Sequence, residues 1–153
     1  MGVYDFTKTA LQELGAELFF ERVALRPGKP TVFARLPNGT FIFGLPGNPV
    51  SVSVTFNLFA RTALQAMQGA AEPTLKQETG LLARSVKGAS ERETFLPCEL
   101  TTNDDGQLIA FPLKWGGSSD FVAFARATAL IILPKTIDLI PEETPVKVVR
   151  LPQ

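Results

Sequence analysis

The fold of the first half of this chain is decided by one stretch, LPGNPVS at residues 45–51. Proline has no amide hydrogen and suits the first position of a helix, and asparagine is a preferred N-cap residue. The stretch therefore predicts a helix that begins at Pro49 with Asn48 as its N-cap. Gly47 lets the backbone approach a ligand, and a helix start presents free amide hydrogens and partial positive charge. Both interpretations, a plain capped helix start and an anion site, stay open.

The segments before this stretch alternate between helical and extended patterns. Apolar residues at helical spacing predict a short amphipathic helix over residues 5–14 that Gly15 ends; its apolar face comprises Phe6, Ala10, Leu11 and Leu14. Aromatic and branched residues then predict extended structure. We expect one strand over 18–25 and a hairpin of strands 31–36 and 40–45 around the turn 37–39.

The helix that begins at Pro49 is expected to run to about Met67. Its apolar residues form two stripes that cover most of its circumference. One stripe comprises Val50, Val54 and Leu58, and the other Phe56, Phe59, Ala63 and Met67. We therefore expect this helix to be buried on more than one side.

The pattern changes after the small, turn-forming segment 69–73, which predicts a domain boundary. Beyond it, extended runs without a helical period predict strands at 79–86, 93–100, 108–112, 128–133 and 146–151, with a turn at 103–106. The fold class is α+β: an α/β domain over residues 1–72, followed by a small β-barrel or sandwich over residues 73–153.

Composition excludes several function classes. The 153 residues are 45% hydrophobic and 20% charged, which is typical of a globular protein. Fifteen basic residues offset fifteen acidic ones, so we expect no nucleic-acid partner. The chain has no histidine, which excludes Ser-His-Asp catalysis and His-ligated metals. Cys98 is expected to be a buried apolar residue, and no apolar run suits a membrane, so we expect a soluble cytoplasmic protein.

A second loop, Arg26-Pro27-Gly28-Lys29-Pro30, holds two cations in a turn that prolines and glycine restrict. It suits an anion, although a plain turn with solvated charges is the alternative. This loop and LPGNPVS both follow strands of one expected sheet, where ligands of open α/β sheets collect. Together they favour a phosphate or an oxyanion.

Three further residues are weaker candidates. Asp5 either caps the first helix or holds a divalent cation that bridges substrate phosphates, for which one carboxylate is too few. Arg92 either clamps a phosphate or pairs with its acidic neighbours. Ser118 lies in a small polar loop, residues 115–120, that is either a hydroxyl donor to an anion or a plain turn.

Three motifs in this order, YDFTK at 4–8, RPGKP at 26–30 and LPGNPVS at 45–51, resemble the carboxyl-terminal half of the molybdopterin molybdenumtransferases, the MoeA and gephyrin E-domain family. The resemblance covers essentially the whole chain, most strongly up to Gly69. It implies a partial α/β/α molybdopterin-binding domain followed by a small all-β barrel-like domain. It also implies insertion of molybdate into adenylylated molybdopterin with release of AMP and with Mg2+ assisting.

The resemblance also assigns roles and partners. It implies Asp5 and Lys29 as catalytic residues, Asp5 also as the metal ligand, and an anion-binding set of Arg26, Gly28, Pro30, Gly47, Asn48, Ser51, Arg92 and Ser118. The partners that it implies are molybdopterin, molybdate, an upstream molybdopterin adenylyltransferase and, in the full-length protein, a second copy in a homodimer.

The chain also departs from the family pattern. Arg26 replaces a usual lysine, and Pro97 stands where relatives often have arginine. The long amino-terminal part of the family is not in this sequence, so we expect a fragment without independent activity. The alternatives are a noncatalytic scaffold or interaction module that retains the fold, and a generic phosphate-binding protein.

Overall fold

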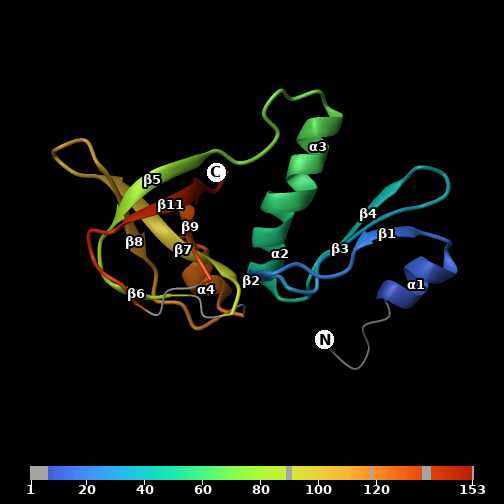
Figure 1. Ribbon diagram of the computed structural model, residues 1–153, viewed down its shortest axis with the longest axis horizontal. Helices are drawn as coiled ribbons and strands as arrows, with labels where there is room; N and C mark the ends of the chain where they lie inside the picture. The colour runs from blue at the N-terminus through green and yellow to red at the C-terminus, as the bar shows by residue number, and fades with distance from the viewer. Residues whose placement is uncertain (1–6, 89–90, 118, 136–138, 153) are drawn as a thin grey trace.

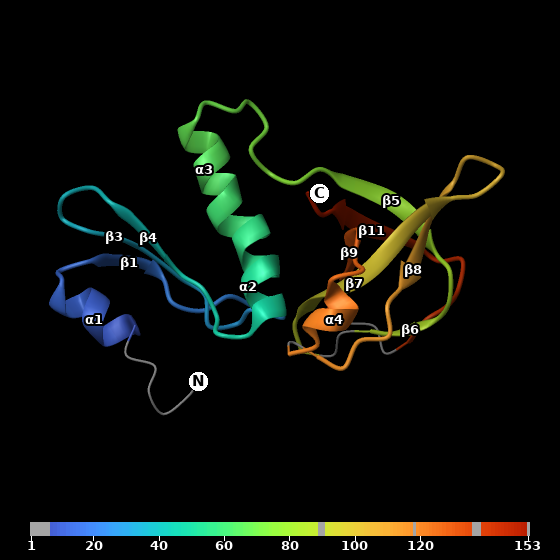
Figure 2. The same cartoon turned by 180° about the vertical axis from the view of Figure 1, so that it is seen from behind.

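The computed structural model describes residues 7–88, 91–117, 119–135 and 139–152 (Figure 1). A small sheet with one helix lies at one end of the molecule, a β-barrel lies at the other, and a longer helical segment stands between them (Figure 1, and from behind Figure 2). Two predicted site residues, Asp5 and Ser118, lie outside the described residues. No helix in the described part of the chain is both long enough and apolar enough to cross a membrane.

The small sheet has the antiparallel order β1-β3-β4, formed by β1 (Glu17–Phe20), β3 (Val32–Arg35) and β4 (Phe41–Gly44). The predicted hairpin is confirmed, and Gly39 at its turn has φ 88°. Helix α1 (Thr7–Glu13) precedes the sheet and ends before Gly15, as predicted.

The predicted apolar face of α1 is only partly correct. Leu11 packs with Val32 and Ala34 in the core beneath the sheet, but Ala10 is exposed and Leu14 is 61% exposed. The helix has only seven described residues, so it brings a single large side chain into this core.

The prediction of one strand over 18–25 is wrong. The chain leaves the small sheet after Phe20 and forms a separate strand, β2 (Leu25–Arg26), which pairs in parallel with β7 (Glu93–Thr102) of the barrel. The backbone amide of Val23 donates to the carbonyl oxygen of Lys29 at 3.0 Å, which closes the intervening segment into a loop. Apolar character alone did not show that these residues belong to two different sheets.

The helical segment begins at Pro49, as predicted, but it is not one regular α-helix. It comprises α2 (Pro49–Thr55), the π-helical turn η1 (Phe56–Ala60) and α3 (Arg61–Met67). Three side chains around the π-helical turn donate to backbone carbonyls one turn earlier: Thr55 Oγ1 to Ser51 at 2.8 Å, Asn57 Nδ2 to Ser53 at 2.9 Å and Thr62 Oγ1 to Leu58 at 2.9 Å. Such bonds compete with the regular helical ladder.

The prediction of Asn48 as the N-cap residue is confirmed, although its side chain makes no capping hydrogen bond. The expected burial on more than one side is only partly correct: Val50 and Val54 are buried, whereas in the second stripe Phe59 and Ala63 are half-buried and Phe56 and Met67 are 41% and 67% exposed. The centre of the Phe59 ring lies 5.9 Å from that of Phe20 on the small sheet, but α3 continues beyond the barrel, so the second apolar face is not covered along its full length (Figures 1 and 2).

The second half forms a closed barrel. Its strands are β5 (Gln77–Leu82), β7 (Glu93–Thr102), β8 (Leu108–Pro112), β9 (Ala129–Leu133) and β11 (Pro145–Arg150). They follow the order β7-β8-β5-β11-β9, and β9 pairs back with β7. These strands confirm the predicted ones, except that the range 79–86 is divided between β5 and the short β6 (Val86–Lys87).

Two short elements of the barrel were not predicted. Strand β10 (Leu139–Ile140) pairs with β6, and helix α4 (Phe121–Phe124) is a single turn before β9. Both are too short to show a hydrophobic period in the sequence. The predicted turn at 103–106 is confirmed by the Gly106 amide, which donates to the Asn103 carbonyl at 3.0 Å.

The two halves share a hydrophobic core. Leu25 and the buried stripe of α2, Val50 and Val54, pack with Phe95 and Leu130 of the barrel. This packing and the β2–β7 pairing place the loop after β2 and the start of α2 beside the barrel. The division of the chain at residue 72 stays a prediction.

Cys98 is buried in the barrel core, as predicted, and burial raises the pKa of its thiol to about 12. The unfolded thiol has a pKa of about 8.5, so folding favours the protonated form, and stability is lost as the pH rises from about 8.5 toward 12. Because only the thiolate reacts, we expect Ellman's reagent at pH 8 to modify the native protein at least about 100-fold more slowly than the guanidinium-unfolded chain. Equal rates would contradict this burial.

Candidate functional site

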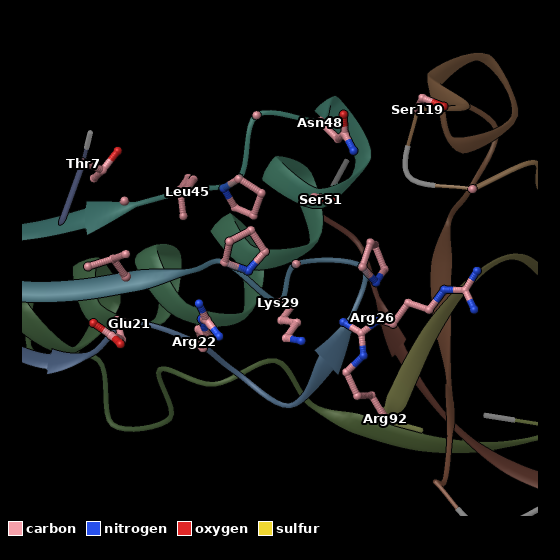
Figure 3. Close-up of a pocket in the computed structure, with 18 of the residues that line it drawn as sticks. Thr7, Glu21, Arg22, Arg26, Lys29, Leu45, Asn48, Ser51, Arg92 and Ser119 are labelled. Atoms are coloured by element: carbon pink, nitrogen blue, oxygen red, sulfur yellow. The ribbon is translucent and has the colours of Figure 1, made fainter. Parts of the chain in front are cut away.

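A cavity of about 1020 Å3 lies where the two halves meet (Figure 3). Its lining includes the RPGKP loop that contains the end of β2, the loop at residues 45–48 before α2, which we call the glycine loop, Arg92 just before β7, and the loop between β8 and α4. All predicted site residues that the structure describes line it: Arg26, Gly28, Lys29, Pro30, Gly47, Asn48, Ser51 and Arg92. The described neighbours of the other two, Thr7 near Asp5 and Ser119 next to Ser118, also line the cavity. The roles assigned to these residues stay predictions.

The RPGKP loop is buried in its middle and carries exposed charges. Pro27 and Gly28 are buried, whereas Arg26 and Lys29 are exposed. Gly28 has φ 122°, and its carbonyl accepts a hydrogen bond from Thr31 Oγ1 at 2.7 Å. The backbone is thus held from within, and the two cations are presented at the cavity.

The glycine loop is buried on one side of Gly47 and open at Gly47 itself. Pro46 is buried, Gly47 and Asn48 are exposed, and Ser51 is 4% exposed in the first turn of α2. A Cβ atom added at Gly47 would meet no atom within 4 Å. The space beside this backbone is therefore free of protein atoms, which suits approach of a ligand to the peptide groups.

Arg92 does not form an ion pair with the glutamates next to it in the sequence, all three of which the structure describes. Its Nη1 donates to the carbonyl oxygen of Leu25 on β2 at 3.3 Å, and the described residues show no ion pair between Arg92 and Glu91 or Glu93. The parallel pairing of β2 with β7 thus brings a cation from the barrel beside Arg26 and Lys29.

Three charged lining residues were missed by the sequence reasoning: Lys8, Glu21 and Arg22. The Lys8 ammonium lies 2.5 Å from the Glu21 carboxylate, and this contact lowers the pKa of Glu21. The adjacent charges of Glu21 and Arg22 interrupt an apolar run, and they were the sequence signal that the strand ends at Phe20. Figure 3 shows Arg22, Lys29 and Arg92 on one side of the view and Asn48 on the other.

The described lining is strongly cationic. Lys8, Arg22, Arg26, Lys29 and Arg92 give five positive charges against the single carboxylate of Glu21, a net charge of +4. A concave surface with one sign of charge concentrates ligands of the opposite sign. The cavity is therefore suited to an anion with several negative charges.

The same residues do not form a magnesium site by themselves. Among the residues that the structure describes, no group of three or more Asp, Glu, Cys or His could hold a metal ion. Glu21 is the only carboxylate in the described lining, and Lys8 already neutralises it. A divalent cation would need oxygen ligands from elsewhere, such as substrate phosphates.

Comparison with known protein families gives matches to both halves. Residues 1–66 match the family described as a probable molybdopterin binding domain, and residues 59–151 match the MoeA C-terminal region, domain IV. The two matches together span nearly the whole chain.

Individual relatives give the same picture. A molybdopterin molybdenumtransferase from Synechococcus elongatus is 34% identical over 149 residues, which is 97% of this chain and 35% of the relative. One from Haemophilus influenzae is 34% identical over 134 residues, 87% of this chain and 33% of the relative. The crystal structure of a MoeA protein from Pyrococcus horikoshii has a TM-score of 0.75 at 27% identity, covering 95% of this chain and 34% of that protein. The chain thus spans about a third of the length of the curated relatives that it matches.

Proposed function

Because this chain belongs to the MoeA family and corresponds to its carboxyl-terminal portion, we propose that it forms part of a molybdopterin molybdenumtransferase. The complete enzyme inserts molybdate into adenylylated molybdopterin and releases AMP. One observation carries this proposal: RPGKP, LPGNPVS and Arg92, distant in sequence, line one cavity with a net charge of +4. Residues 1–72 supply the molybdopterin-binding part, and residues 73–153 supply the barrel.

The cations of the cavity hold the negative groups of the two substrates. Molybdate is a dianion, and adenylylated molybdopterin carries phosphates. A guanidinium binds such oxygens through two parallel hydrogen bonds, so Arg26 and Arg92 orient a phosphate or oxyanion more strictly than lysine does. Lys29 adds a compact charge, and the open backbone at Gly47 brings peptide groups to the same ligand.

Asp5 and Ser118 complete the proposed site. Asp5 would hold Mg2+ together with substrate phosphates, and the ion would supply positive charge against those phosphates. The hydroxyl of Ser118 donates to the anion. These two roles rest on the family resemblance, and the described residues contain no group of three or more Asp, Glu, Cys or His that could hold the ion without further ligands.

We expect Lys29→Ala to weaken molybdate binding by the 153-residue chain about fivefold, because one cation of the cavity is lost. The melting temperature should change by no more than about 1 °C, since an exposed turn cation contributes little to stability. Isothermal titration calorimetry with molybdate measures the affinity, which should fall as salt is added.

The matched control is Lys147→Ala, since Lys147 is exposed on β11 and does not belong to the described lining. This variant should bind like the unmodified chain. Equal affinities of Lys29→Ala and Lys147→Ala would show that Lys29 is only a solvated turn residue. Molybdate-dependent release of AMP by the complete enzyme then separates a transferase from a scaffold that binds anions without turnover.

A further inference from the structure

Trp115 lies in the loop between β8 and α4 and is the only tryptophan of the chain. It packs against the core shared by the two halves and also lines the cationic cavity. Its indole Nε1 is buried and is the one such side-chain atom without a hydrogen-bond partner in the described part of the chain.

A buried indole N–H without an acceptor is unfavourable, because the donor has lost water and gained nothing in return. Tryptophan in protein interiors therefore normally has a partner for this group. The neighbouring carboxylate of Asp120 accepts instead the backbone amide of Gly116, at 3.0 Å. Because Trp115 lines the cavity, a ligand bound there is a candidate source of the acceptor.

We propose that Trp115 is a ligand-binding residue, whose indole N–H donates to an oxygen of the anion bound in this cavity. The inference rests on the proposed function, because it requires that the cavity binds an oxyanion or a phosphate group. Because Nε1 is buried, this donation requires the indole to turn toward the cavity that it lines.

The indole differs in kind from the cations around it. It is a neutral group that only donates, so it recognises an acceptor oxygen in a defined direction and adds no charge. Its contribution to affinity should therefore not depend on salt, whereas that of Lys29 should decrease as salt rises.

The test titrates the 153-residue chain and its Trp115→Phe variant with molybdate by calorimetry, at low and at high salt. Phenylalanine keeps an aromatic ring and removes the N–H group. We expect the variant to bind about tenfold more weakly, with the same ratio at both salt concentrations. Thermal unfolding of the variant checks that it is folded.

A second measurement needs no variant. The single indole 15N–1H resonance of the unmodified chain should move downfield when molybdate binds, as expected for a donor that gains an acceptor. Molybdate binding in the calorimeter with an unmoved indole resonance, or with unchanged affinity of a folded Trp115→Phe variant, overturns the role of Trp115 and leaves the anion site intact. No binding by the unmodified chain overturns the anion site itself and this inference with it.

Discussion

Replacement of Gly28 by alanine is expected to destabilise the protein by about 3 kcal/mol, from strain at positive φ and from overpacking. Gly28 has φ 122°, a backbone conformation that side-chain-bearing residues rarely adopt. The added Cβ atom would lie 2.3 Å from Thr55 Cγ2 and 3.0 Å from Leu25 Cδ1. Because Leu25 and Thr55 belong to the buried junction between β2 and α2, neither can move freely.

Urea unfolding of matched variants separates the two causes. Gly39 also has positive φ, 88°, but a Cβ atom there would meet nothing within 4 Å, so Gly39→Ala should cost only about 1 kcal/mol. Thr55→Ser removes the methyl group in contact and keeps the hydroxyl that donates to the Ser51 carbonyl. It should therefore restore part of the stability of Gly28→Ala. Equal midpoints for the Gly28→Ala and Gly39→Ala variants would show that the close contact has no effect.

The Gly28→Ala variant should also bind anions more weakly. Gly28 lies between the two cations of RPGKP, and its carbonyl accepts the hydroxyl of Thr31. A displacement of this backbone moves Arg26 and Lys29 relative to the glycine loop. We therefore expect Gly28→Ala to bind molybdate more weakly than Lys29→Ala does, even at temperatures where it remains folded.

The second large effect is expected for Asp5→Asn in the complete transferase that we propose. Asparagine suits a helix cap as aspartate does, so stability should hardly change, but the charge proposed to hold Mg2+ is lost. We expect molybdate-dependent AMP release to fall by about 100-fold, which is within the several kcal/mol that a bound metal supplies. Added Mg2+ should restore part of the rate.

The matched control is Glu13→Gln, which removes a carboxylate from the far end of α1, where Glu13 is exposed and does not belong to the described cavity lining. Its turnover should equal that of the unmodified enzyme. Unchanged turnover in Asp5→Asn would mean that helix capping is the whole role of Asp5.

The sequence by itself determined those features that local chemistry controls. Pro49 sets the start of the helical segment, because proline suits the first helical position and cannot donate within a preceding ladder. Gly39 and Gly106 set two turns, because each adopts positive φ at little cost. RPGKP and LPGNPVS were predicted to be anion loops from local chemistry as well: prolines and glycines restrict or open the backbone of both, and RPGKP adds two cations.

Only the tertiary structure decided how these loops meet. The sequence placed RPGKP and LPGNPVS after strands of one sheet, which is wrong: RPGKP begins at the end of β2, which pairs with β7 of the barrel, and LPGNPVS follows β4 of the small sheet. The contact of Arg92 with Leu25 joins residues 67 positions apart, and the pairing of β2 with β7 that creates it has no signature in either segment alone. Two further residues show the same dependence. The pKa of Glu21 is lowered by the Lys8 ammonium beside it, and the indole N–H of Trp115 is left without an acceptor by the described residues around it. The hydrophobic period of a segment shows which side of a helix or strand is apolar. Long-range packing decides which segments become neighbours, and the residues that line this cavity come from segments that only such packing brings together.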